Sequence, residues 1–391
     1  MIPVAAALDA LFDLARPTET EDVPLRMAGG RILREDVVAS RDQPPFAASA
    51  MDGYAIADGA AGDRLRVIGE SAAGHRFARG VGRGEAVRIF TGAPVPEGTT
   101  RIAIQEDVTA EGDSIVLDSD DAATHIRPSG GDFRAGFRVP APRRIGPQDL
   151  ALLAAMNAGT VRVARRPRVA IIATGDELVM PGDAPGPDQI VASNTFGLHA
   201  LLQDLGADPR LLPIARDTTA ALDTVLGLVD DADLVLTVGG ASVGDHDLVA
   251  QAAAARGLDR AFYKVAMRPG KPLMAGRLGE AAMIGLPGNP VSAMVCGHVF
   301  VAPVVRAMLG LGAAPAPRQA APLAHDLSEN GPREHYMRAR LEDGVLHVFD
   351  RQDSALLSVL QAADALVVRP PRDDARRAGE RVAYLPLGGH A

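Results

Sequence analysis

Cysteine, tryptophan and aromatic residues in general are scarce in this 391-residue sequence. The one cysteine, Cys296, excludes an intramolecular disulfide and any cysteine-rich zinc or iron–sulfur site. Aromatic residues make up 4% of the chain and tryptophan is missing, so stacking platforms for nucleic-acid bases are poorly supplied. A single thiol is typical of a reducing compartment, and we expect a cytoplasmic protein.

Positive charge and uninterrupted apolar runs are lacking as well. Lys and Arg total 40 against 49 Asp and Glu, a net charge of −9, so we expect neither nucleic acid nor an anionic membrane as a partner. The most apolar stretch, Val291–Leu309, follows a proline and contains His298 and Arg306, which favours a buried helix over a membrane span. Residues 1–17 have helical apolar spacing without a basic start, which predicts a packed helix and not a signal peptide.

What is present predicts several folded domains. At about 150 residues per domain the chain has room for two to four. Short β-rich runs such as Leu65–Ile68 and Arg101–Ile104, separated by Gly and Pro, indicate a small all-β module. A helical run, Asp149–Met156, leads to Gly159, and we expect it to pack beside the N-terminal helix.

Strand and helix patterns alternate from Arg168 to Leu309. The predicted strands are 169–172, 211–214 and 234–238, and the predicted helices are 193–206 and 218–229. Such alternation implies a parallel sheet covered by helices, an open α/β domain, with ligands where strands end and helices begin.

After residue 317 the pattern becomes β-rich again. Two strands, 336–341 and 345–349, flank Glu342-Asp343-Gly344, which is a hairpin signal. A helix at 354–363 and strands at 366–368 and 382–385 complete a compact tail.

A glycine-rich turn follows the predicted strand 234–238. It runs Gly239-Gly240-Ala241-Ser242-Val243-Gly244-Asp245-His246-Asp247, and small residues let backbone N–H groups approach an anion at a helix start. The spacing imitates a P-loop, but Asp245 stands where the lysine should be, which excludes a Walker-type ATPase. The turn predicts a phosphate cradle, and it also fits an ordinary tight turn.

Two further turns carry suitable chemistry. Lys264, Arg268 and Lys271 lie within a stretch stiffened by proline and glycine, which suits a fixed oxyanion or, alternatively, a solvated loop. In Gly285–Ser292, Asn289 fits an N-cap with a proline at the first helical position, a good cap that could also bind an anion.

Acidic residues follow the same strands. They are Asp176 and Glu177 after the first strand, Asp217 after the second, and Asp245 and Asp247 in the glycine-rich turn. Carboxylates beside phosphates repel them unless a hard cation intervenes, and Mg²⁺ takes one or two carboxylates plus substrate phosphates. The cluster predicts Mg²⁺-dependent phosphate chemistry, although each acid alone also fits a helix cap or an exposed charge.

Met51–Ala55 and Thr91–Gly98 are both predicted to be turns. The sequence contains no H-E-x-x-H and no G-x-G-x-x-G. Dinucleotide dehydrogenase chemistry is therefore not supported.

Taken together, the motifs resemble those of the molybdopterin molybdenumtransferases of MoeA type, a family that includes the E domain of gephyrin. The motifs that carry the resemblance, in the family's order, are Met51–Ala55, Thr91–Gly98, Thr174–Leu178, Gly239–Asp247, Lys264–Pro272 and Gly285–Ser292. The resemblance implies an enzyme that takes adenylylated molybdopterin and molybdate, cleaves the pyrophosphate link with Mg²⁺, inserts the metal and releases AMP. It also implies a homodimer with the cleft between subunits, and possible contacts with a molybdopterin adenylyltransferase and with molybdoenzymes.

The resemblance further implies a multidomain α/β and β architecture. The regions are an N-terminal helical and β dimerisation region (1–50 and 132–165), a small β module (51–131), a central open α/β molybdopterin-binding domain (166–311) and a β-barrel-like C-terminal domain (312–391).

Site residues are carried over by motif position. The catalytic positions are Asp52, Thr91, Glu177, Asp217 and Asp247, with Asp132 as a further match, and Glu177, Asp217 and Asp247 would bind Mg²⁺. The positions implied to bind substrate are Gly240, Ser242, Gly244, Lys264, Arg268, Lys271, Pro287, Pro290 and Ser292. Arg333 and Ser354 resemble residues that close on molybdate.

Two positions depart from the family pattern. Arg268 stands where lysine is common, which exchanges a compact ammonium for a planar fork, and Ala241 replaces the usual valine. The alternatives are a non-catalytic gephyrin-like scaffold, a molybdopterin adenylyltransferase, or a generic sugar-phosphate or nucleotide enzyme.

Overall fold

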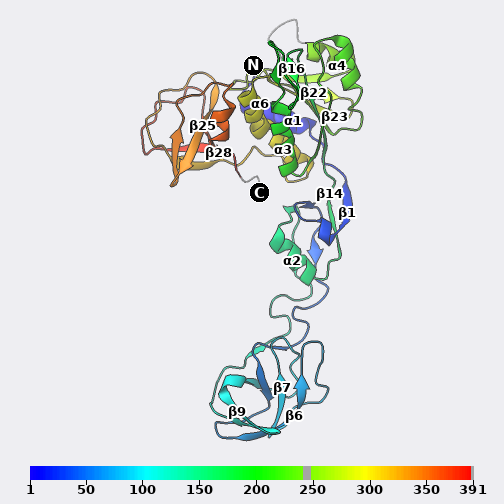
Figure 1. The fold of residues 1–391 in the computed structure, drawn as a ribbon, viewed down its shortest axis with the longest axis vertical. Coiled ribbons are helices and arrows are strands. Elements are labelled where there is room, and N and C mark those ends of the chain that lie inside the picture. The colour runs from blue at the N-terminus through cyan, green and yellow to red at the C-terminus, as the bar shows by residue number, and fades with distance from the viewer. Residues whose placement is uncertain (241–247, 389–391) are drawn as a thin grey trace.

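The computed structural model describes residues 1–240 and 248–388. Figure 1 shows an elongated chain with a small β module at one end, a linking region in the middle, and an α/β domain beside a C-terminal β domain at the other end. The small β module therefore lies far from the strand ends of the α/β domain, where most of the predicted site residues are. The position of a residue along the long axis of the molecule decides which other site residues it can contact within one chain.

The α/β domain is built on a mixed six-stranded sheet with the order β18-β15-β19-β23-β22-β20. The strands are β15 (Arg168–Ala173), β18 (Asp208–Leu211), β19 (Leu234–Val238), β20 (Asp259–Tyr263), β22 (Met274–Leu278) and β23 (Ala281–Leu286). The first four strands in the order are parallel, as predicted, but β22 runs antiparallel to both of its neighbours, β23 and β20. The turn at Gly279-Glu280 is too short for a crossover, so β22 and β23 must form a hairpin.

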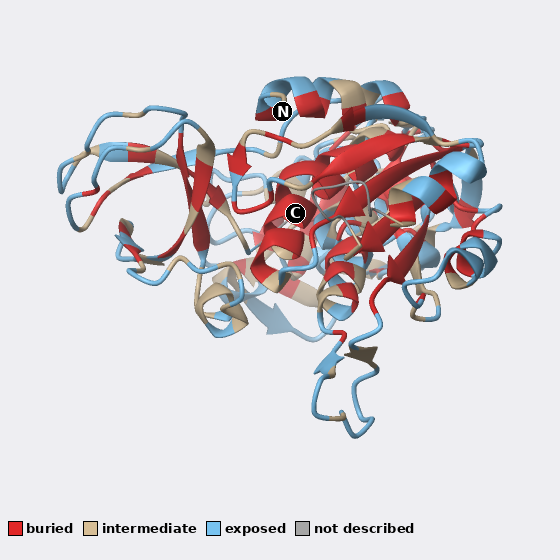
Figure 2. Ribbon diagram, turned by 90° about the horizontal axis from the view of Figure 1, so that it is seen from above, coloured by how far each residue is buried: buried red, intermediate tan, exposed pale blue. Residues whose placement is uncertain are grey.

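Helices cover both faces of this sheet. Alternate residues of β15 point to opposite faces, and because these residues are apolar on both faces, each face needs a covering layer. Val169 and Ile171 belong to one buried cluster, whereas Ala170 and Ile172 belong to another. The helices packed on the first face are α1 (Val4–Leu14), α3 (Asn194–Asp204), α6 (Pro290–Cys296) and α7 (Ala302–Met308). Those on the second face are α4 (Thr219–Leu226) and α5 (Leu248–Ala255). Figure 2 shows the buried residues concentrated between these layers.

The most apolar stretch forms one continuous helix in the core. The α6 and α7 segments are joined by a π-helical turn, η3 (Gly297–Val301). Among the described residues this helix, Pro290–Met308, is the one long and apolar enough to cross a membrane, and 83% of its apolar window is buried inside the fold. The predicted buried helix is therefore confirmed.

The linking region has its own small core. A sheet with the order β1-β14-β2-β13 comprises β1 (Thr20–Pro24), β2 (Ile32–Leu33), β13 (Arg143–Arg144) and β14 (Thr160–Ala164). The 3-10 turn η1 (Leu25–Met27) and the helix α2 (Pro147–Ala155) pack against it. The prediction that α2 packs beside the N-terminal helix was wrong: α1 is buried in the α/β core, because its apolar stripe finds a larger apolar surface there.

The small β module is a six-stranded sheet with the order β8-β5-β7-β6-β10-β9. Its strands are β5 (Gly53–Ile56), β6 (Arg64–Ser71), β7 (Glu85–Ile89), β8 (Arg101–Ile104), β9 (Val108–Glu111) and β10 (Ser114–Leu117), with a 3-10 turn, η2 (Gln105–Asp107). Met51–Ala55 was predicted to be a turn, but Gly53 begins a central strand. A Cβ at Gly53 would lie 2.0 Å from the Ala103 carbonyl oxygen, so glycine permits the close pairing of β5 with β8.

Three short strand pairs lie outside the larger sheets. They are β3 (Val37–Val38) with β12 (Arg138–Val139), β4 (Ala48–Ser49) with β11 (Ile126–Arg127), and β16 (Leu178–Val179) with β17 (Ile190–Val191). The last pair is parallel and leads directly into α3.

The C-terminal domain is a sheet with the order β21-β25-β27-β28-β24, with β26 paired to β25. Its strands are β21 (Met267–Arg268), β24 (Gln319–Pro322), β25 (Glu334–Glu342), β26 (Val345–Val348), β27 (Ala365–Arg369) and β28 (Arg381–Pro386). A bridge between Leu323 and Leu346 brings the end of β24 to β26, which gives the barrel-like closure that was predicted. The helix α8 (Leu357–Gln361) is shorter than predicted, and β18 begins at Asp208 instead of 211.

Candidate active site

A pocket of about 600 Å³ lies at the carboxyl ends of β15, β19 and β23. This is the edge at which open α/β sheets bind ligands. The residues that line it are Ala173, Thr174, Glu177, Leu178, Ile190, Val191, Ala192, Ser193, Asn194, Thr195, Val238, Gly239, Pro272, Pro287, Gly288, Asn289, Pro290 and Ala355. Of the predicted site residues, Glu177, Pro287 and Pro290 line this pocket.

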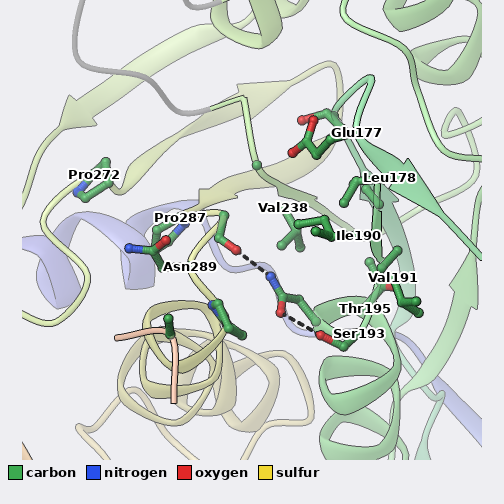
Figure 3. Close-up of a pocket in the computed structure, with 18 residues that line it drawn as sticks. Glu177, Leu178, Ile190, Val191, Ser193, Thr195, Val238, Pro272, Pro287 and Asn289 are labelled. Carbon is green, nitrogen blue, oxygen red and sulfur yellow. Dashed lines mark hydrogen bonds between the residues drawn. The ribbon is translucent and has the colours of Figure 1, made fainter. Parts of the chain in front are cut away.

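The pocket has an apolar side and a polar side (Figure 3). Leu178, Ile190 and Val191 come from the β16–β17 pair and lie on the side where Glu177 also points inward. The Asn194 amide donates to the Gly288 carbonyl at 2.7 Å, which fixes the start of α3 to the turn before α6. Such a cavity suits a ligand with a flat apolar part and a charged polar part.

The sequence did not single out the apolar wall. Ile190 and Val191 are 59% and 41% exposed although they are β-branched apolar residues. They follow a loop rich in Gly and Pro, and apolar side chains that stay exposed at a strand end are the signal that would have indicated a binding surface.

Two glycines bring the backbone close to the pocket edge. Gly239 and Gly240 have φ angles of 95° and 65°, which favour glycine. A Cβ on Gly239 would lie 2.5 Å from the Thr174 carbonyl oxygen, and one on Gly240 would lie 2.4 Å from a Val249 methyl group. The rest of the predicted phosphate cradle, including Ser242, Gly244 and Asp247, lies outside the described residues.

Three carboxylates gather beside the pocket. Glu177 lines it, Asp176 precedes it in the chain, and the backbone N–H of Asp217 donates to Asp176 Oδ1 at 3.0 Å. Partial burial, followed by the negative charges of Asp176 and Glu177, raises the pKa of Asp217. Converging like charges of this kind oppose one another unless a cation lies between them.

The turn before α6 is linked to the C-terminal domain. Asn289 is the N-cap of α6, as predicted, but its side chain does not cap the helix and instead donates to Ser354 Oγ at 2.9 Å. The Val291 N–H donates to the Ser354 carbonyl at 3.0 Å, and Ala355 lines the pocket. The C-terminal domain therefore contributes a wall of the site.

The cationic segment lies between the α/β sheet and the C-terminal domain, next to the pocket lining at Pro272. Lys264 has a φ of 83°, and its Nζ lies 5.1 Å from the centre of the Tyr263 ring. Backbone hydrogen bonds join Lys264 N–H to the Leu273 carbonyl at 2.8 Å, and β21 brings Arg268 beside His335. Lys264, Arg268 and Lys271 are not themselves among the residues that line the pocket.

His335 is a buried neutral group in this cationic surrounding. Burial, then Arg268, Arg338, Arg369 and Arg333 in that order, lowers the pKa of His335 to about 4. Its side chain is buried and its Nε2 has no hydrogen-bond partner among the described residues. A proton on this ring would place a further positive charge among arginines.

We expect His335 to make the fold sensitive to acid. The unfolded chain binds a proton at His335 near pH 6.5, whereas the folded chain does so only near pH 4. Stability from this residue is therefore complete above pH 6.5 and is lost as the pH falls toward 4, by about 3 kcal/mol. His335→Gln should flatten this part of the pH dependence of the free energy of unfolding, measured by urea denaturation between pH 7.5 and 4.5. Parallel curves for the two proteins would contradict the assignment.

Other predicted site residues lie away from the pocket. Asp52 Oδ1 accepts hydrogen bonds from the Thr91 N–H at 2.7 Å and the Thr91 hydroxyl at 2.9 Å, and these bonds lower the pKa of Asp52. Both residues lie in the small β module, at the opposite end of the chain from the pocket (Figure 1). Asp132 is exposed in the linking region, and Ser292 is 4% exposed in the core side of α6. One chain alone does not bring these residues to the pocket.

The fold and the pocket together define an α/β protein with a candidate ligand site at the carboxyl ends of parallel strands. Three family models match the chain: "MoeA N-terminal region (domain I and II)" over residues 2–157, "Probable molybdopterin binding domain" over 170–307, and "MoeA C-terminal region (domain IV)" over 320–387. The chain belongs to the molybdopterin molybdenumtransferase family, a family of transferases in molybdenum cofactor biosynthesis.

Individual relatives agree with this membership. A molybdopterin molybdenumtransferase of Nostoc sp. is 36% identical over 94% of this chain and 89% of its own length. The enzyme of the same name from Haemophilus influenzae is 37% identical over 77% of this chain and 76% of its own length. The solved structure of a molybdopterin biosynthesis MoeA protein from Pyrococcus horikosii covers 100% of both chains with a TM-score of 0.85 at 29% identity. The family and the fold class expected from the sequence are thereby confirmed.

Proposed function

We propose that this protein inserts molybdenum from molybdate into adenylylated molybdopterin and releases AMP. The single observation that carries the proposal is the pocket at the strand ends, which combines an apolar wall, a glycine turn and a carboxylate cluster. An apolar wall suits the pterin, whereas the glycine turn suits the pyrophosphate. Matches to the family models on both sides of the α/β domain disfavour a stand-alone adenylyltransferase.

The carboxylates fit a magnesium ion. Asp176 and Glu177 lie close enough to Asp217 to raise its pKa, and carboxylate oxygens are the donors that Mg²⁺ prefers. Within residues 1–240 and 248–388 no three acidic, histidine or cysteine side chains form a closed metal cage. In the proposed site, Glu177 and Asp217 would be the protein ligands and substrate phosphates would supply the remaining ones. When bound, Mg²⁺ would neutralise charge that develops on the pyrophosphate link.

The chain's own residues then have separate tasks. Leu178, Ile190 and Val191 exclude water from one side of the ligand, and Gly239 allows the backbone to approach it. The cationic segment from Lys264 to Lys271 supplies a positive field for molybdate, a doubly charged oxyanion. Asn289 orients the Ser354 hydroxyl beside the start of α6, where an oxyanion gains from the helix N-terminus.

We also propose that the working site is shared between two copies of the chain. Asp52 and Thr91 match functional positions of the family but lie in the module at the far end of the molecule. A two-fold dimer would let the β module of one subunit cover the pocket of its partner. We further propose a cytoplasmic location, which the single cysteine supports.

Incubation with adenylylated molybdopterin, Mg²⁺ and molybdate tests the function. The expected result is release of AMP together with cofactor that reactivates a molybdenum-free molybdoenzyme. Omitting molybdate or adding a magnesium chelator should remove the active product. AMP release in the absence of any active cofactor would favour a different pyrophosphatase reaction.

A further inference from the structure

Arg338 is a fully buried residue of β25 that does not line the pocket. Its Nη2 donates to the Asp353 carbonyl at 2.9 Å and to the Arg351 carbonyl at 3.4 Å. Its backbone N–H donates to Gln352 Oε1 at 3.0 Å, and its carbonyl accepts from Gln352 Nε2 at 3.0 Å. Arg338 therefore holds the turn 351–353 by side chain and backbone together.

The turn that Arg338 holds leads directly to the pocket. The next residue, Ser354, accepts from the Asn289 side chain through its hydroxyl and from the Val291 N–H through its carbonyl. Ala355 then lines the pocket, and its N–H donates to Asp353 Oδ1 at 2.8 Å. A displacement of the turn would move the Ser354 hydroxyl and one wall of the pocket together.

The contacts of Arg338 are poorly suited to stabilising the fold. Its Nε and Nη1 are buried and have no hydrogen-bond partner within the described part of the chain. Burial of an arginine costs free energy unless its N–H groups donate hydrogen bonds. A buried arginine with two unpaired nitrogen atoms at a domain junction therefore indicates a role other than packing.

Arg369 shows what a structural buried arginine looks like in the same domain. It is 2% exposed, forms an ion pair with Asp373, and donates to the carbonyls of Ser328 and Asp374 at 3.1 and 2.7 Å. These partners belong to loops of the C-terminal domain, and no atom of the turn 351–353 is among them. Arg369 is thus a matched control.

We propose that Arg338 is a positioning residue of the pocket, which fixes the 351–353 turn so that Ser354 meets the start of α6 and thereby sets the affinity for an oxyanion. That the oxyanion is molybdate rests on the proposed function. Lysine keeps the charge but has no planar fork with which to span two carbonyl groups. Glutamine removes the charge and reaches less far.

Steady-state kinetics with molybdate varied separate positioning from packing. Arg338→Gln should raise the KM for molybdate about tenfold while kcat changes by less than about twofold, and Arg338→Lys should recover part of the loss. Arg369→Gln should lower the melting temperature but leave the KM for molybdate unchanged. Gln352→Ala removes the hydrogen bonds between the Gln352 side chain and the Arg338 backbone and leaves the buried charge of Arg338 in place. This variant should also raise the KM for molybdate. Unchanged KM values in folded Gln352→Ala and Arg338→Lys would overturn the proposal.

Amide hydrogen exchange tests the positioning role independently of turnover. The N–H groups of Val291 and Ala355 should exchange faster in Arg338→Gln than in the wild type, and at the wild-type rate in Arg369→Gln. Equal exchange in Arg338→Gln and the wild type would overturn the role of Arg338, whatever the substrate. Faster exchange in Arg338→Gln, in a protein whose wild type releases no AMP with molybdate, would leave the positioning role intact and refute the proposed function instead.

Discussion

Asp217→Asn should abolish turnover and, at neutral pH, raise the stability of the folded protein. In the wild type, burial and the charges of Asp176 and Glu177 raise the pKa of Asp217 above its ordinary value. The stability tied to its protonated form is present below pH 3.8 and is lost as the pH rises through the folded-state pKa. Asparagine is neutral at every pH, so it removes this repulsion. As a proposed Mg²⁺ ligand, however, Asp217 is needed for catalysis, and we expect kcat to fall by about 100-fold or more.

Thermal unfolding at pH 7.5 and AMP release under saturating Mg²⁺ measure the two effects. Asp223→Asn is the matched control, because Asp223 lies in the same domain and pairs with Arg256 away from the pocket. It should retain turnover and show no gain in melting temperature. A lower melting temperature for Asp217→Asn would show that Asp217 serves the fold, and retained turnover would remove it from the site.

Two inactive variants should restore activity when they are combined in one dimer. Asp52→Asn inactivates the part that a subunit would lend to its partner, whereas Asp217→Asn inactivates the subunit's own pocket. A mixed dimer would contain one site with both changes and one site with neither. Random mixing makes about half of the dimers mixed, so about a quarter of wild-type turnover should return.

The measurement requires subunit exchange, by co-expression or by joint refolding, followed by AMP-release assays. Each variant treated alone provides the baseline, and the chain carrying both changes, combined with the Asp52→Asn variant, should give no recovery. Activity equal to the sum of the two residual activities, in a preparation that contains mixed dimers, would mean that the site is complete within one chain. Asparagine at residue 52 is preferred to alanine, because its side-chain oxygen can still accept from Thr91.

Much of the fold was predictable where local pattern and burial agree. The strands β8 and β19 were predicted at their observed bounds, because a short apolar run between turn residues favours a strand that ends at those turns. The hairpin after β25 follows from Asp343 and Gly344, both of which have positive φ angles. By contrast, the edge strand β18 begins at Asp208, and its polar residues gave no apolar signal there.

The candidate site was only partly predictable. Glu177, Pro287 and Asn289 were marked by motif, and all three line the pocket. Ile190 and Val191 were missed because an exposed apolar pair has no distinctive spacing. Arg338 was missed because it acts through the turn at 351–353, and a hydrogen bond from a side chain to a backbone carbonyl of another segment leaves no pattern in the sequence.

The sequence by itself determined the order of domains, the strand–turn–helix units of the α/β domain and the chemical types of the site residues. These properties are set by hydrophobic period, turn residues and charge, all of which act over a few neighbouring positions. Only the tertiary structure decided that α1 joins the α/β core, that β22 runs antiparallel to both of its neighbours in the sheet, and that Asp52 lies far from Asp217 within one chain. Contacts between distant segments depend on which apolar and polar surfaces meet after folding, and local sequence does not encode that choice.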